Sequence, residues 1–238
     1  MKHASKLALV VMAVALLASV AQGATTLIDE DFNAMTTGSN NLAGQNGWTF
    51  LAGVNSSDVV PVTNFGTIDS SFTGNAINGV ATGQYYCPFD VALPGDTTFI
   101  VMEWDIHTTG SATASVGLYD SPAIGQPLFQ VTPNSNTQAW RVRDNQGTTT
   151  FATDNIGIGS TIKSFHMRAV LNMANATVDV FGTNLTDLGS ETLMIQDLAI
   201  NLDLGESVFD ADGVYLRGPQ NGAIDNIVVT AVPEPATM

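Results

Sequence analysis

The sequence predicts an all-β protein built as a two-sheet antiparallel sandwich. Short runs that alternate apolar with polar residues recur along the chain, and clusters of Gly, Asn, Thr, Ser and Asp separate them. A period of two with frequent turn residues is typical of sandwich strands. Charged residues make up only 12% of the chain, so the side chains that usually fill exposed helix faces are scarce. Residues 24–238 have the length of a single sandwich domain.

The first 23 residues have the layout of a secretory signal peptide. A short basic start precedes an apolar run from Leu7 to Val20, and small residues at Ala21 and Gly23 mark a cleavage site. This run of 14 residues is shorter than the roughly 20 apolar residues of a membrane-spanning helix. We therefore expect export with Ala24 as the new N-terminus, and a retained membrane anchor is the alternative.

Apolar alternation places the expected strands along the rest of the chain. The segment 192–204 has weak helical spacing and is interpreted as a strand or a loop. Long loops at 33–46 and 152–160 are expected at the ends of strands. In order, the expected strands are 99–106, 140–143, 165–171, 178–180, 214–216 and 224–230.

The charge of the mature chain excludes several classes of partner. Lys2 and Lys6 fall in the signal peptide, which leaves five basic side chains against 22 acidic ones and a net charge of −17. Such a field repels nucleic acid and anionic membrane surfaces, while divalent cations and neutral polymers remain compatible with it. Cys87 is the single cysteine, so no internal disulfide can form, and we expect a small buried thiol.

Segments at both ends of the mature chain resemble a known fold family. Residues 27–33 (LIDEDFN) and 42–48 (LAGQNGW) resemble the opening of concanavalin A-like (LamG-like) jelly-roll domains of bacterial surface proteins. Residues 222–230 (GAIDNIVVT) resemble the closing strand of those domains, which usually lies beside the opening strand. The resemblance implies a concanavalin A-like jelly roll over residues 24–231.

The tail at 232–238 (VPEPATM) resembles the start of a PEP-CTERM sorting signal, with Pro233, Glu234 and Pro235 matching the motif. In that family an apolar span and an Arg-rich end follow, and an exosortase-type enzyme processes the signal in Gram-negative bacteria that make extracellular polysaccharide. The resemblance implies a secreted or cell-surface protein of such a bacterium. The span and the basic end are absent here, so the chain is either truncated or simply secreted. Membrane association is expected only through such a missing anchor.

One expected strand carries three titratable residues on one face, Glu103, Asp105 and His107. The pattern resembles the catalytic strand of family-16-type glycoside hydrolases, in which His107 would stand where the acid/base Glu belongs. Retaining hydrolysis needs two carboxyl groups about 5 Å apart. A solvated polar face is the favoured interpretation, and a glycan-active hydrolase that uses Glu103 and Asp105 is the alternative.

Calcium binding is a second possibility that the sequence raises. Asp210 and Asp212 alternate before Gly213, as carboxylates do in calcium loops, although an ordinary hairpin turn explains the same residues. A different site would form where the chain ends meet, if Asp29 or Asp31 lies near Asp225. A calcium-stabilised structural coat protein is the function that this pattern would support.

Aromatic and polar residues supply the candidates for carbohydrate binding, because sugar rings stack on aromatic faces and polar side chains bind their hydroxyls. Trp104 and Trp140 have the parity of core residues, whereas Arg141 and Arg143 face outward. The predicted function is therefore non-enzymatic binding or organisation of extracellular polysaccharide. The candidate residues are Glu103, Asp105, His107, Trp48, Tyr85, Tyr86, Arg141 and Arg143, with Tyr119 and Tyr215 as further aromatic candidates.

Overall fold

The computed structural model describes most of the chain. The described residues are 23–53, 55, 57–65, 68–79, 83–108, 114–120, 127–134, 139–158, 162–202, 207–218 and 222–233. The predicted signal peptide, apart from Gly23, and residues 234–238 of the predicted sorting segment lie outside these ranges. Within them, no helix is both long and apolar enough to cross a membrane.

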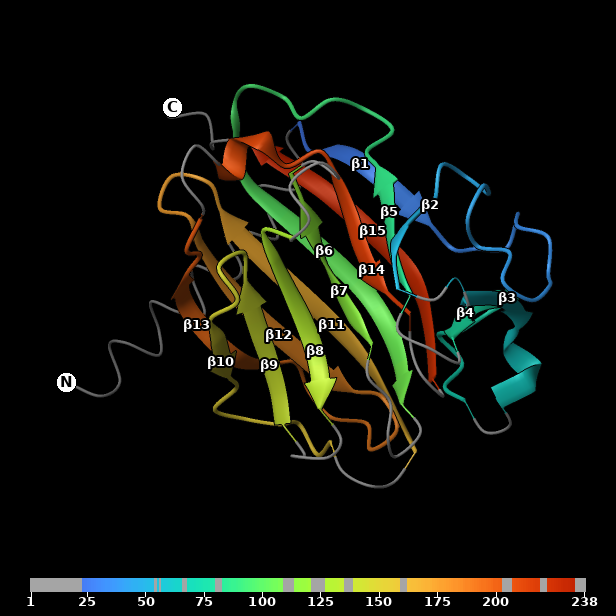
Figure 1. Ribbon diagram of the computed structural model, residues 1–238. Coiled ribbons are helices and arrows are strands. Elements are labelled where there is room, and N and C mark those ends of the chain that lie inside the picture. Colours follow the sequence, from blue (N-terminus) through green and yellow to red (C-terminus); the bar gives the residue numbers. More distant parts are fainter. Residues whose placement is uncertain are drawn as a thin grey trace.

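The described strands form two antiparallel sheets that stack face to face (Figure 1). Sheet A has eight strands and sheet B has seven within the described ranges. Sheet A contains, in order, β13 (Thr192–Ala199), β12 (Thr177–Asn184), β11 (Lys163–Asn172), β6 (Thr97–Thr108), β15 (Gly222–Pro233), β4 (Asn75–Gly79) and β3 (Ser57–Pro61), and β1 (Thr25–Glu30) also pairs with β15. Sheet B contains, in order, β10 (Thr149–Phe151), β9 (Ala139–Asp144), β8 (Phe129–Asn134), β7 (Ser115–Tyr119), β14 (Gly213–Arg217), β5 (Gln84–Pro88) and β2 (Thr49–Ala52).

Several neighbouring strands in each sheet are far apart in sequence, which confirms the predicted two-sheet antiparallel jelly roll. The chain leaves one sheet and enters the other repeatedly, so that β14 lies between β7 and β5. Two short 3₁₀ turns, η1 (Val62–Phe65) and η2 (Val208–Asp210), occur in the described connections.

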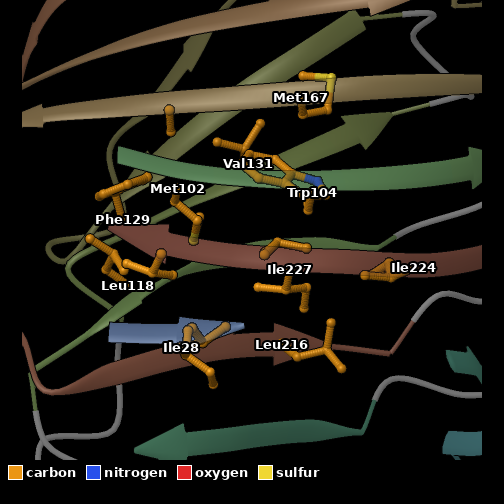
Figure 2. Packing of buried hydrophobic residues seen from close by; sticks show 14 of the residues in the cluster. Ile28, Met102, Trp104, Leu118, Phe129, Val131, Met167, Leu216, Ile224 and Ile227 are labelled. Carbon is orange, nitrogen blue, oxygen red and sulfur yellow. The ribbon is translucent and has the colours of Figure 1, made fainter. Parts of the chain in front are cut away.

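The core fills the space between the sheets, where alternate side chains of both sheets meet (Figure 2). Met102 and Trp104 on β6 point toward Phe129 and Val131 on β8. The rings of Trp140 and Phe165 meet across the sheets in a T-shaped pair, with centroids 5.3 Å apart. The core thus contains Trp104 and Trp140, as their parity predicted.

All of the expected strands are confirmed, and 192–204 begins with strand β13. The single cysteine, Cys87, is buried as expected. Burial, followed by the nearby carboxylates of Glu30 and Asp90, raises the pKa of its thiol to about 12. The thiol therefore remains protonated and packs as a small apolar group.

The strand β15 joins the two ends of the chain. It pairs with β6 along one side and with β1 and β4 along the other, so the opening and closing strands lie together as the resemblance implied. A bulge at Asn226, which has a left-handed backbone with φ of 53°, interrupts its pairing with β6. The strand continues to Pro233, beyond the expected domain end at residue 231.

Candidate functional site: the outer face of sheet B

The outer face of sheet B gathers aromatic and basic side chains from strands that are distant in sequence. On β14, Val214 and Leu216 point into the core, so Tyr215 and Arg217 point outward. The pairing register places Tyr86 of β5 opposite Tyr215. Outward positions of β7, β8 and β9 continue the same rows across the sheet.

Three tyrosines form a compact cluster on this face. The rings of Tyr119 and Tyr215 stack with centroids 5.8 Å apart and an interplanar angle of 17°. Tyr86 meets Tyr119 at 5.7 Å in a tilted arrangement and donates its hydroxyl hydrogen to the carbonyl oxygen of Asp212, 3.4 Å away. Burial raises the pKa of Tyr215 to about 12 and raises that of Tyr86 further, so both phenols stay neutral hydrogen-bonding groups.

Three arginines lie on the same face as the tyrosines. Arg141 and Arg143 come from β9, and Arg217 comes from β14 on the far side of β8 and β7. The two strands between them carry short hydroxyl side chains, and the hydroxyl oxygens of Ser115 and Thr132 lie 2.8 Å apart. We call Arg141, Arg143 and Arg217 together with Tyr86, Tyr119 and Tyr215 the arginine–tyrosine face.

Within the described part of the chain, the arginines of this face have no carboxylate partner. Among the described residues, none of the three forms an ion pair, and Nε of Arg217 is buried without a hydrogen-bond partner. Burial and then the positive charges of Arg217 and Arg143 lower the pKa of Arg141. The guanidinium groups are therefore close enough to repel one another.

An exposed aromatic ring extends the face at the edge of the sheet. Phe151 of β10 lies opposite Arg141, and 53% of its surface is exposed. A large exposed ring beside a guanidinium group offers a surface on which a sugar ring can stack. The sequence interpretation missed both Phe151 and Arg217, although the period-two parity of their strands was the signal that could have identified them.

The predicted carbohydrate-binding residues fall into three separate places. Tyr86, Arg141 and Arg143 lie together on the arginine–tyrosine face. Trp48 and Tyr85 lie in the core, where the exposed fraction is 1% for Trp48 and 0% for Tyr85. The hydroxyl group of Tyr85 donates to Oδ1 of Asn55 and accepts a hydrogen bond from a backbone amide, which fixes the ring inside the sandwich.

The three titratable residues of β6 share one face, as predicted, but this is the outer face of sheet A, away from the arginines. Asp105 is almost fully buried there, and both of its carboxylate oxygens have partners. Nδ1 of His166 on β11 donates to Oδ1 at 2.8 Å, and Nδ2 of Asn226 on β15 donates to Oδ2 at 2.8 Å. Nε2 of His166 lies 3.8 Å from the carboxylate of Glu103.

Electrostatics fixes the charge state of this histidine cluster, defined as Glu103, Asp105, His166, Asp225 and Asn226. The hydrogen bonds to Asp105 and then Glu103 raise the pKa of His166 to about 9, so the imidazole is protonated at neutral pH. The hydrogen bond from His166 is also the main reason that the pKa of Glu103 is lowered. The carboxylates of β6 thus balance a half-buried cation and are not a free carboxyl pair.

His107 lies further along the same face, beneath two aromatic rings. Phe65 and Phe72 pack edge-on against its imidazole, with centroids 6.0 and 6.2 Å away. Nδ1 of His107 lies 2.9 Å from Oγ of Ser164, and burial lowers its pKa. The ring is therefore neutral and enclosed, in contrast to the solvated polar face expected from the sequence.

The predicted calcium ligands lie in different parts of the described structure. Within the described ranges, no group of three His, Cys, Asp or Glu side chains is placed to hold a metal ion. Asp225 is fully buried and accepts hydrogen bonds from the backbone amides of Thr73 and Asn226, and burial raises its pKa to about 7. Asp31 lies near enough to Asp225 for its charge to add to this increase in pKa, as the sequence predicted, and it accepts hydrogen bonds from the backbone and side chain of Asn33.

The other predicted calcium ligands are Asp29, Asp210 and Asp212, and they have different surroundings. Asp29 lines a pocket of about 280 Å³ together with Glu30, Asn46 and Asp90. Asp210 is exposed at the end of η2, and Asp212 meets the tyrosine cluster through its carbonyl oxygen. The segment before Gly213 thus supports the arginine–tyrosine face and leads directly into β14.

The two-sheet antiparallel architecture defines the class of the protein as a concanavalin A-like jelly roll. Among solved structures, lectin UEA-II complexed with galactose is similar with a TM-score of 0.50 and 6% identity, over 88% of this chain and 100% of that chain. Peanut lectin with a bound 9mer peptide has a TM-score of 0.49 and 11% identity, over 89% of this chain and 100% of that one.

A GH131 beta-glucanase catalytic domain from Podospora anserina has a TM-score of 0.48 and 10% identity, over 90% of this chain and 97% of that chain. No protein-family model and no curated protein matches the chain. At these identities the likeness to solved structures concerns the fold alone, so the function must be argued from the site.

Proposed function

We propose that this chain is an exported, non-enzymatic β-sandwich protein that binds polysaccharide on the outer face of sheet B. One observation carries the proposal: arginines without a carboxylate partner among the described residues and an exposed phenylalanine share one face, where they surround three buried tyrosines. Arginine side chains hydrogen-bond sugar hydroxyls, and the ring of Phe151 provides an apolar surface for a pyranose.

The absence of carboxylates from the face supports binding without hydrolysis. In the strands of sheet B that the structure describes, no outward-facing position holds Asp or Glu. Glycoside hydrolysis by the usual routes needs two carboxyl groups on either side of the scissile bond. The carboxylates of Glu103 and Asp105 lie on sheet A and are occupied by His166 and Asn226.

The ends of the chain support a location outside the cytoplasmic membrane. The signal-peptide pattern of residues 1–23 supports export, and the Val-Pro-Glu-Pro segment at 232–235 supports sorting to the surface by an exosortase-type enzyme of a Gram-negative bacterium. Binding of extracellular polysaccharide is the activity that suits such a location.

Binding to a panel of polysaccharides, measured on an array and then by calorimetry, tests the proposal. We expect Phe151→Ala to weaken binding about tenfold, because loss of a stacked ring costs about 1–3 kcal/mol. Phe209→Ala removes another exposed ring outside the strands of sheet B and serves as the matched control, with binding unchanged.

The same polysaccharides should be assayed for new reducing ends. We expect none. Cleavage that Glu103→Gln abolishes would overturn the non-enzymatic proposal and identify sheet A as the active face. Binding that Phe151→Ala leaves intact would show that the ligand lies elsewhere.

A further inference from the structure

The five basic side chains of residues 24–238 divide into two groups with different surroundings. Lys163 lies 2.7 Å from a carboxylate oxygen of Asp187, and Arg168 lies 2.6 Å from one of Glu191, both at the surface of sheet A. Arg141, Arg143 and Arg217 have no such partner among the described residues. In a chain with 22 acidic residues, three neighbouring arginines without a carboxylate are a specific arrangement.

The arrangement is unfavourable in the free protein. Like charges on one face repel each other, and the buried Nε of Arg217 lacks the hydrogen bond that a desolvated donor requires. Anionic groups placed against the face would relieve the repulsion between the guanidinium groups. Guanidinium groups bind planar and tetrahedral oxyanions through two parallel hydrogen bonds.

The arginines converge from strands that are separated in the sheet. Neighbouring strands lie about 4.8 Å apart, and three strand steps separate Arg141 from Arg217, so their backbones are roughly 14 Å apart. Arg143 lies two residues from Arg141 along β9, roughly 7 Å away. The guanidinium groups nevertheless lie close enough for Arg217 and Arg143 to lower the pKa of Arg141, so the face concentrates positive charge that an anionic ligand would neutralise. The exposed ring of Phe151 beside Arg141 favours a polymer that contains sugar rings.

We propose that the ligand of the arginine–tyrosine face is an anionic polysaccharide whose carboxylate or sulfate groups bind Arg141, Arg143 and Arg217. The inference rests on the proposed function and narrows its ligand class. The net charge of −17 over residues 24–238 opposes binding of an acidic polysaccharide less strongly than it opposes binding of nucleic acid. Duplex DNA carries one charge per about 1.7 Å, whereas an acidic polysaccharide carries at most a few charges within the reach of this face. Salt screens the remaining charges beyond about 8 Å.

The test compares four polymers on the purified protein by calorimetry: a polyuronate, its carboxyl-reduced neutral derivative, a sulfated polysaccharide of similar length, and duplex DNA. We expect the neutral derivative to bind at least about tenfold more weakly than the polyuronate, because a hydrogen bond to a charged group is worth about 1.5–3 kcal/mol. Tight binding of either anionic polysaccharide supports the proposal, and the two anionic arms distinguish carboxylate from sulfate.

Arginine variants locate the charge dependence. Arg141→Gln and Arg217→Gln should each weaken binding of the anionic polymer about tenfold and weaken binding of the neutral derivative much less, because a hydrogen bond to a charged group is worth more than one to a sugar hydroxyl. Arg168→Gln, on sheet A, is the matched control and should leave both unchanged. Thermal unfolding of each variant checks that it folds, and a bound anionic polymer should raise the Tm of the parent protein.

Two outcomes overturn the inference in different ways. Equal binding of the polyuronate and its neutral derivative would refute the anionic ligand and leave the proposed polysaccharide binding intact. Failure of every polysaccharide to bind would refute both. DNA binding as tight as polyuronate binding would show that charge alone is recognised, which also contradicts the inference.

Discussion

A glycine on β14 determines where the tyrosine cluster of sheet B lies. Gly213 has no side chain, and the ring of Tyr86 from the neighbouring strand occupies the space above it. From this position the ring reaches Tyr119, which stacks on Tyr215. One residue without a Cβ thus allows three large rings to pack on the surface of a sheet.

Gly213→Ala is therefore expected to destabilise the protein by about 1–3 kcal/mol, as overpacking does in other close-packed sites. The added Cβ would lie 2.5 Å from the carbonyl oxygen of Cys87 and closer still to the Tyr86 ring. Urea unfolding measures the loss of stability, and near-ultraviolet circular dichroism reports the tyrosine packing.

Gly95→Ala is the control for Gly213→Ala, because it adds a Cβ where there is free space. A Cβ at Gly95 would meet nothing within 4 Å, so stability should be unchanged or rise by up to about 1 kcal/mol. Equal effects of the two substitutions would show that the tyrosine packing does not depend on the space above Gly213.

At the scale of the strands, the histidine cluster connects β6, β11 and β15 on the outer face of sheet A. His166 and Asn226 reach Asp105 from the two strands that flank β6. Asn226 also donates to the carbonyl oxygen of Ser71, which ties the segment before β4 to the sheet. A single buried carboxylate therefore holds three strands in register.

The cluster should make stability fall as the pH rises. The pKa of His166 rises from 6.5 to about 9 on folding, so its contribution is complete below pH 6.5 and is lost by about pH 9. The pKa of Asp225 rises from 3.8 to about 7, so its contribution is also lost as the pH increases through about 7. Urea unfolding between about pH 5 and 9 is expected to show a steady decrease in the free energy of unfolding.

His166→Gln tests which group causes this dependence. The variant should lose about 2 kcal/mol at neutral pH, because Asp105 stays buried without a cationic partner. Above about pH 7, where His166 is the group of the cluster that titrates, the free energy of unfolding of the variant should change little with pH. A variant with the parent profile above about pH 7 would contradict the charge state assigned to His166.

The long strands of sheet A could be predicted from the sequence, whereas most of sheet B could not. Strands such as β12 alternate buried with half-buried residues, and the period of two is visible. All five residues of β7 are buried, so the contrast between a buried and an exposed face is lost in that strand. The three-residue β10 and the four-residue β2 are too short to show a pattern.

The candidate site could be predicted only in part for a related reason. Parity along β9 identifies Arg141 and Arg143 as outward-facing, and this information is local. Arg217 lies on the same face only because β14 is inserted between β7 and β5. This pairing brings together segments that are about a hundred residues apart in sequence. The placement of Tyr85 in the core likewise depends on which face of β5 meets sheet A.

For the whole molecule, the large negative net charge favours solubility but destabilises the compact folded state. Residues 24–238 have only five basic side chains against 22 acidic ones, a net charge of −17, so like charges repel one another in the folded state. We expect added sodium chloride to raise the Tm by a few degrees, because salt screens this repulsion beyond about 8 Å. A differential scanning calorimetry series in salt measures the shift. A Tm that falls with salt would show that local ion pairs outweigh the overall repulsion.

The last of the described strands to leave the ribosome occupies the middle of sheet A. Until residues 222–233 are made, β6 has no neighbour on one side, and β1 has no partner to pair with. The growing chain therefore cannot close its sandwich early, and contacts between β1 and β15 must form across about two hundred residues. A sandwich of this topology completes its folding late in synthesis, which would suit the export that we propose.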